Sequence, residues 1–173
     1  MGFIQKVVTP NSSPDRKVAD EMKVRDPYTP ADFGDLGLRH EVNVFVFRVA
    51  DKGIEYLLLQ PNPIHEGVWR PVVHPVRLDE HLNHAALRGV RIETGLDRPF
   101  DLVRASAAPI RDLGDMRLIG WPFAFQVRDP KVKVCANEFL ADCTWQCYDE
   151  ALQIISDELH RQNLMQLHIK LVA

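Results

Sequence analysis

The sequence lacks the features that would place it in an exported, disulfide-bonded or membrane class. Its 173 residues include three cysteines, Cys135, Cys143 and Cys147, and this odd, closely spaced set does not resemble a disulfide framework. No apolar run is long enough to cross a bilayer, and residues 1–8 are too short and too polar for a signal peptide. Since reduced thiols are typical of the cytoplasm, we expect a cytoplasmic protein without a membrane role.

Basic charge is also scarce. The chain has 21 lysines and arginines against 24 aspartates and glutamates, which makes the formal net charge -3. A nucleic-acid-binding surface usually shows a clear basic excess, so we expect no nucleic-acid partner. Apolar residues make up 46% of the chain and charged residues 26%, a composition typical of a globular protein with a buried core. This charge is compatible with a small charged ligand.

Four prolines interrupt the first 38 residues: Pro10, Pro14, Pro27 and Pro30. Because proline fixes φ and removes a backbone donor, this stretch cannot form one long helix or strand. We interpret residues 1–38 as an N-terminal arm with a short helix over 15–23. The arm is expected to pack on the following domain or on a second subunit, and the second arrangement predicts a homodimer.

Residues 39–173 show the patterns of a folded domain. Residues 42–49 are apolar on both faces of a predicted strand, and the turn signal Asp51-Lys52-Gly53 leads into a returning strand over 54–60. Further strands are expected at 68–76, 102–110, 116–127 and 144–148, with helices at 79–94, 149–156 and 158–171. Pro122 predicts an edge position or a bulge for its strand. The order of elements predicts an α+β fold with a mixed sheet between helices.

The helix expected at 79–94 carries the most informative segment. Asp79 is a plausible N-cap and Gly95 a plausible residue after the last turn. The segment WRPVVHPVRLDEHLNHAALRGVRIETGL, residues 69–96, resembles the Nudix box and its approach strand. The box of that family follows G-x5-E-x7-R-E-U-x-E-E-x-G-U, where U is aliphatic, after a tryptophan, a proline and two glycines.

The register needs no gap. The matching residues are Trp69, Glu80, Arg88, Val90, Glu93, Gly95 and Leu96. We call residues 74–96 the box. Near the C-terminus, TWQCYDEALQII over 144–155 is similar to the closing strand and helix of the family.

The resemblance implies a Nudix-type α/β/α sandwich with a mixed sheet between helices. It also implies hydrolysis of a nucleoside diphosphate linked to another group, with magnesium or manganese as cofactor. Under this resemblance Glu93 would be a catalytic residue and metal ligand, and Glu80 a second catalytic candidate. Arg88 and Gly95 would have structural roles in the box, with Arg88 pairing with Glu80 or Glu93.

Most of the expected metal ligands are missing. Positions 89, 92 and 93 share one face of the predicted helix, and this chain places Gly89, Ile92 and Glu93 there instead of three glutamates. Val73 and His74 replace the two glycines of the approach loop, which changes its shape. Magnesium prefers oxygen ligands, and only Glu93 offers them.

Two functions follow from this pattern. The first is a protein with a degraded metal-binding box that lacks normal pyrophosphohydrolase activity and binds a nucleotide-like ligand or a partner. The alternative is an active hydrolase of a nucleoside diphosphate derivative with an altered magnesium site, helped by Glu138 or Asp142. His81 and His84 stand three residues apart and could share a transition metal, although exposed helix histidines are the more common case.

Overall fold

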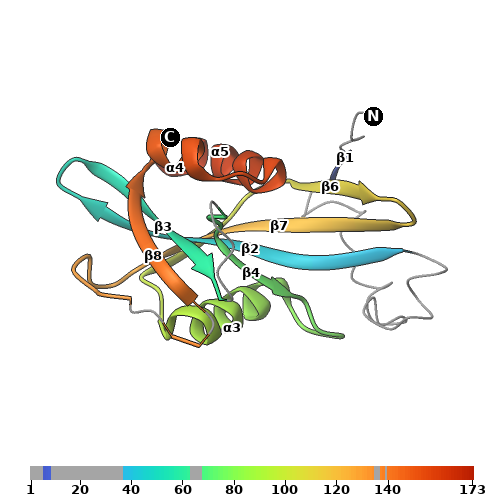
Figure 1. Cartoon of the computed structure of the whole chain (residues 1–173), viewed down its shortest axis with the longest axis horizontal. Helices are drawn as coiled ribbons and strands as arrows, with labels where there is room; N and C mark the ends of the chain where they lie inside the picture. Colours follow the sequence, from blue (N-terminus) through green and yellow to red (C-terminus); the bar gives the residue numbers. More distant parts are fainter. Residues whose placement is uncertain (1–5, 9–36, 63–67, 135–136, 139) are drawn as a thin grey trace.

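A mixed sheet of eight strands forms the centre of the protein (Figure 1). The computed structural model describes residues 6–8, 37–62, 68–134, 137–138 and 140–173. The strands are β1 Lys6–Val8, β2 Leu38–Ala50, β3 Gly53–Pro61, β4 Val72–Pro75, β5 Asp101–Arg104, β6 Ala108–Leu113, β7 Met116–Gln126 and β8 Leu140–Cys147. The helices are α3 Leu82–Thr94, α4 Tyr148–Ile154 and α5 Glu158–Val172.

Two long central strands hold the sheet together. The order is β1-β6-β7-β2-β3-β8, with β4 added to β2 and β5 added to β7. β2 and β7 are parallel, whereas the other pairs are antiparallel. Helix α3 covers one face of the sheet, and α4 and α5 cover the other (Figure 1). This is the expected α/β/α sandwich.

The core is divided into two layers by the alternation of side chains along β2. Val42, Val44 and Val46 belong to the layer that includes residues of α3, whereas Phe45 and Phe47 belong to the layer that includes residues of α4 and α5. All five are at most 3% exposed, which confirms a strand that is buried on both faces. Trp69, the tryptophan of the approach strand, packs against the layer under α4 and α5.

The two ends of α3 differ from each other in how well the sequence predicted them. The helix starts at Leu82 after His81, and Asp79 lies in the preceding loop with φ of 61°, so the prediction of Asp79 as N-cap is wrong. Gly95 has φ of 76° and its amide donates to the carbonyl of Arg91 at 2.9 Å, which confirms its position at the end of the helix.

Pro122 lies in the interior of the sheet, so of the two alternatives predicted for it, an edge position or a bulge, the edge position is wrong. β7 pairs with β2 on one side and with β6 and then β5 on the other. The Pro122 carbonyl accepts from the Ala105 amide at 3.2 Å, beyond the last pair of β5. Since the amide and carbonyl of a strand residue point to the same side, the missing donor of Pro122 faces the gap between β5 and β6.

The remaining predictions concern the termini and the cysteines. Within the arm, Lys6–Val8 forms β1 and pairs with β6, while the helix expected over 15–23 lies outside the described residues. Cys147 is a free, exposed thiol, the Cys143 thiol donates to the Val134 carbonyl at 3.0 Å, and Cys135 lies outside the described residues. In the part of the chain that the structure describes, no helix is long and apolar enough to cross a membrane.

Candidate functional site

Glu80 and Arg88 form a buried ion pair that ties the loop before α3 to the helix. Arg88 Nε donates to Glu80 Oε2 at 2.8 Å and Nη2 donates to Oε1 at 2.9 Å, and both side chains are 6% exposed. Arg88 also donates to the Pro75 carbonyl at 2.6 Å, and the Arg77 amide donates to Glu80 at 3.0 Å. Burial opposes ionisation of Glu80, but hydrogen bonds from Arg88, Arg77 and His84 outweigh it and lower its pKa to about 2.

These contacts correspond to one of the two pairings expected for Arg88. They hold both oxygens of Glu80 within the loop, which is a structural arrangement. A catalytic role for Glu80 remains a prediction.

Glu93 forms a second ion pair, with a residue that the motif did not include. Arg70 Nη2 donates to Glu93 Oε1 at 2.7 Å and Nη1 donates to Oε2 at 3.2 Å. The Val73 amide donates to Oε2 at 3.3 Å, and Glu93 is 4% exposed. Both carboxylate oxygens therefore accept hydrogen bonds from the protein, and a metal ion at Glu93 would compete with Arg70 for them.

The space beside Gly89 is filled by His74. A Cβ placed on Gly89 would lie 3.1 Å from His74 Cβ and 3.2 Å from its Cγ. Burial lowers the pKa of His74, against the opposing attraction of Glu93, so its neutral ring is favoured. Ile92, the third position of this helix face, is half-buried. Gly89 and Ile92, which share this helix face with Glu93, thus offer no carboxylate beside it.

The other metal-ligand candidates are dispersed. His81 is exposed just before α3, and His84 is exposed and pairs with Glu80 through its Nδ1 at 2.9 Å. Glu138 and Asp142 are exposed. Across the ranges that the structure describes, no three histidine, cysteine, aspartate or glutamate side chains are grouped as a metal site requires.

A cleft of about 320 Å³ lies beside the pair of Arg70 and Glu93, and the sequence analysis did not predict it. Its polar lining residues come from separate parts of the chain: Glu41, Arg70, Arg111, Asp157 and His160. Arg70 lines the cleft and also binds Glu93, so it connects the cleft with α3. The only sequence signal was a charged residue beside the tryptophan of the approach strand. We call this space the cleft.

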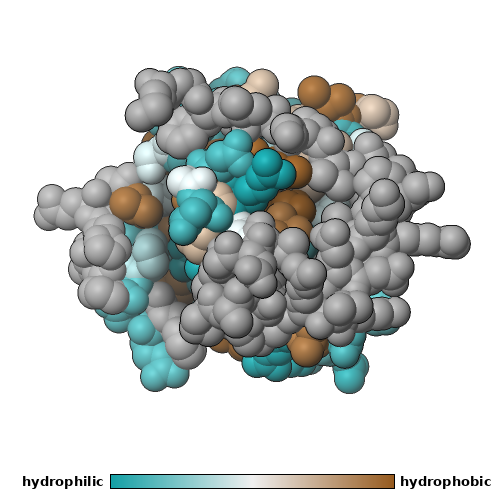
Figure 2. All heavy atoms as spheres, turned by 90° about the vertical axis from the view of Figure 1, so that its right-hand side faces the viewer, coloured by the Kyte–Doolittle hydropathy of each residue, from teal (hydrophilic) through white to brown (hydrophobic). Residues whose placement is uncertain are grey.

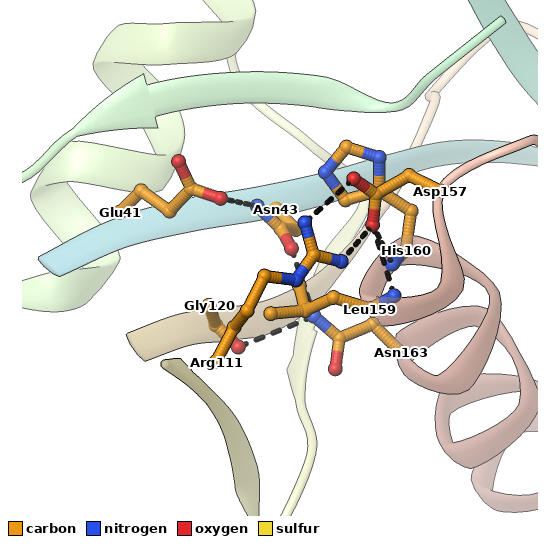
Figure 3. Close-up of polar contacts among 8 residues, drawn as sticks. All are labelled: Glu41, Asn43, Arg111, Gly120, Asp157, Leu159, His160 and Asn163. Atoms are coloured by element: carbon orange, nitrogen blue, oxygen red, sulfur yellow. Dashed lines mark hydrogen bonds and ion pairs between the residues drawn. The ribbon is translucent and has the colours of Figure 1, made fainter. Parts of the chain in front are cut away.

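Arg111 and Asp157 form the ion pair of the cleft wall (Figure 3). Both terminal nitrogens of Arg111 donate to the carboxylate, with Nη1 at 2.9 Å from Oδ2. Asp157 also caps α5, because its Oδ1 accepts from the amides of Leu159 and His160 at 2.9 and 3.2 Å. Burial opposes ionisation of Asp157, but the hydrogen bonds from Arg111 outweigh it and lower its pKa to about 2.

A chain of buried amides leads from the cleft into the protein (Figure 3). Asn43 donates to Glu41 Oε1 at 3.1 Å and accepts from Asn163 Nδ2 at 2.9 Å. Asn163 also donates to the Gly120 carbonyl at 3.2 Å. A Cβ on Gly120 would lie 2.6 Å from Leu159 Cδ2 and 2.9 Å from Asn43 Oδ1, so one or both of these side chains would have to shift. This network holds the walls of the cleft in one arrangement.

Burial shifts the pKa of the two remaining titratable groups of the cleft. Burial raises the pKa of Glu41, and Asp157 adds to this, although the hydrogen bond from Asn43 opposes it. Burial lowers the pKa of His160 to about 4. Val73, Leu118 and Leu159 provide apolar lining. β6 and the start of α5 lie toward the right of Figure 1, and the coloured surface at that end mixes hydrophilic and hydrophobic side chains (Figure 2).

The chain was compared with known proteins at the level of sequence and of structure. No protein-family model matches it, and neither does any curated protein. Among solved structures, a Nudix hydrolase of Listeria monocytogenes superposes with a TM-score of 0.66 at 16% identity, covering 77% of this chain and 94% of that one. The dihydroneopterin triphosphate pyrophosphohydrolase of E. coli has a TM-score of 0.64 at 19% identity, covering 76% and 95%.

A third similar structure covers more of the chain. The Nudix domain of NrtR from Shewanella oneidensis, solved in complex with ADP ribose, has a TM-score of 0.64 at 16% identity. The match covers 92% of this chain and 99% of that domain. Together these likenesses show that the protein has the Nudix fold.

Proposed function

Starting from the Nudix fold, we propose that this protein binds a nucleotide-like ligand and does not carry out the usual metal-dependent pyrophosphate hydrolysis. The observation that carries the proposal is the bidentate pair of Arg70 and Glu93. Glu93 is the one carboxylate left on the metal-binding face of the box, and its partner is a fixed guanidinium.

Magnesium fits this arrangement poorly. It demands near-octahedral oxygen ligands, and even sparse sites use one or two carboxylates with free oxygens. Displacing Arg70 would break a hydrogen-bonded ion pair; breaking a fully buried pair costs about 3–5 kcal/mol, and the cost here is smaller because Arg70 is 19% exposed. Gly89 and Ile92 offer no oxygen from their side chains to offset this cost. Magnesium or manganese therefore remains a cofactor only for the alternative, an active hydrolase with an altered site.

The cleft supports binding. Its volume of about 320 Å³ lies at the lower end of the range for small-molecule sites, and its lining combines three apolar side chains with charged and hydrogen-bonding groups. The NrtR domain, which aligns with most of this chain, was solved with ADP ribose. That neighbour supports a nucleotide-like ligand for this protein as well.

A combined screen tests the proposal. Nucleoside diphosphate derivatives are incubated with the protein and magnesium or manganese, while hydrolysis and thermal unfolding are followed in the same wells. We expect an increased melting temperature with some of these compounds and no turnover. Turnover that depends on the metal and disappears in Glu93→Gln would contradict the proposal and establish the hydrolase.

Two further expectations accompany this function. A protein partner in place of a small ligand would leave the melting temperature unchanged by every compound of the screen. A homodimer, expected from the proline-rich arm, is tested by size-exclusion chromatography with light scattering, and a monomeric mass would contradict it.

A further inference from the structure

One hydrogen-bonding edge of Arg70 has no acceptor among the residues that the structure describes. A guanidinium carries five N–H donors in one plane. Its terminal nitrogens bind Glu93, and Nη1 also donates to the Pro71 carbonyl at 2.8 Å. None of the described residues accepts from Nε or from the second hydrogen of Nη2. These two N–H groups lie on the same side of the guanidinium, so they form an unused fork in a residue that lines the cleft.

Arg111 repeats this arrangement on another wall of the cleft. Both of its terminal nitrogens bind Asp157, while no acceptor for its Nε lies within the described ranges. Asp157 is in turn fixed as the cap of α5, and Glu93 is fixed by α3 and the Val73 amide. The terminal nitrogens of each arginine are therefore fixed by a carboxylate that belongs to a helix or to its cap.

We propose that Arg70 and Arg111 hold the phosphate groups of the ligand directly, so that a resident guanidinium takes the place of the divalent cation. This inference rests on the proposed function, because it concerns how the same ligand is bound. The planar fork of arginine matches phosphate oxygens in a bidentate manner, and its side chain stays charged at all relevant pH values. Glu93 then serves to orient Arg70 and has no metal to bind.

The charge of Glu41 affects how well this site can bind a phosphate group. Its side chain lines the cleft together with Arg111 and Asp157, so an ionised Glu41 would repel a phosphate group. The neutral amide of Glu41→Gln removes this repulsion and can keep the hydrogen bond from Asn43. We therefore expect Glu41→Gln to bind the ligand several-fold more tightly than the natural protein.

The test uses ADP ribose as the probe and the whole chain, with binding measured by isothermal titration calorimetry in EDTA and again with magnesium. We expect the same dissociation constant in both solutions, within about twofold. Arg70→Lys keeps the positive charge but loses the fork, and should weaken binding about tenfold, or about 1.4 kcal/mol. The matched control is Arg48→Lys: Arg48 also pairs with a glutamate, Glu55 at 2.9 Å, but does not line the cleft.

A competition experiment locates the contact on the ligand. Inorganic pyrophosphate should displace ADP ribose in EDTA, whereas adenosine should not. If Arg70→Lys does not fold, the double variant Arg70→Met with Glu93→Met removes the pair as a unit and should show the same loss of affinity.

The outcomes separate the two proposals. Binding of ADP ribose that requires magnesium, or that is unchanged in both Arg70 variants, overturns this inference and leaves the proposed function in place. Failure of ADP ribose and of every compound in the nucleotide screen to bind overturns the proposed function itself. Metal-independent binding that weakens in the Arg70 variants supports both.

Discussion

Two bidentate arginine–glutamate pairs involve the box, one through Nε and Nη2 of Arg88 and one through both terminal nitrogens of Arg70, and they serve different parts of the molecule. The pair of Arg88 and Glu80 lies within the box and fastens its loop to α3. The pair of Arg70 and Glu93 joins the box to the approach strand and faces the cleft. The pair of Arg88 and Glu80 stabilises α3, the helix that also carries Glu93 of the second pair. The same chemistry is thus structural in one place and suited to binding in the other.

The difference between the two pairs is tested first by replacing each arginine in turn. Arg88→Met leaves the buried Glu80 carboxylate without its main partner, so we expect a loss of about 3–5 kcal/mol in the free energy of unfolding. Arg70→Met should cost less, because Arg70 is 19% exposed at the cleft and water can reach Glu93 once it is gone. Denaturation in guanidinium chloride measures both.

A double variant serves as the control for this experiment. Arg88→Met combined with Glu80→Met removes the whole pair and should recover most of the lost stability. Equal losses in Arg88→Met and Arg70→Met would contradict the distinction between a closed and an open pair. In Arg70→Met we also expect weak manganese binding by the freed Glu93, seen by electron paramagnetic resonance.

The second test returns a carboxylate to the box. Gly89→Glu places a Cβ 3.1 Å from His74 Cβ, a contact tighter than most between packed side chains, so His74 must move slightly. We expect a destabilisation of about 1–3 kcal/mol and no gain of hydrolysis. Adding His74→Gly should relieve the clash. Restored turnover in the single variant Gly89→Glu would show that Arg70 does not prevent metal binding.

The third test uses pH to isolate the structural pair. The folded-state pKa of Glu80 is lowered from its ordinary value of 4.5 to about 2. A lowered pKa means that the pair contributes stability above about pH 4.5 and loses it as the pH falls toward 2. The stability difference between the natural protein and Glu80→Gln should therefore shrink over this window, by on the order of 1–2 kcal/mol after solvent screening. A constant difference from pH 5 to pH 2 would contradict the pairing.

The sequence predicted the fold and the first pair better than the second pair and the cleft. Local signals were sufficient for the β2–β3 hairpin and the end of α3 at Gly95. The family resemblance left Glu80 and Glu93 open as partners of Arg88, and the structure pairs Arg88 with Glu80. The edge position predicted for Pro122 was wrong because a local rule cannot show where the neighbouring strands end. In the sheet, Pro122 lies between the last pair of β6 and the last pair of β5 with β7.

The cleft had no sequence signature for a different reason. Glu41, Arg111 and Asp157 belong to β2, β6 and the start of α5, and only the order of strands in the sheet brings them together. Arg70 precedes the box, so a motif that begins at position 74 cannot include it. A family pattern shows which of its positions carry other residue types, but it does not show what lies against those positions in space.

The smallest expected effect concerns Gly95, which ends the helix shared by both pairs. Gly95 has φ of 76°, and nothing lies within 4 Å of a Cβ placed there, so Gly95→Ala adds backbone strain without a clash. We expect a loss of about 1 kcal/mol in the free energy of unfolding, and less for Gly95→Asn, since asparagine tolerates this conformation better. The substitution alters the end of the helix that both pairs share and favours neither pair over the other. The affinity for ADP ribose should therefore stay constant in Gly95→Ala and in Gly95→Asn. A weaker affinity in a variant that is fully folded would mean that the end of α3 is needed to position Glu93, which lies closer to Gly95 than Arg88 does.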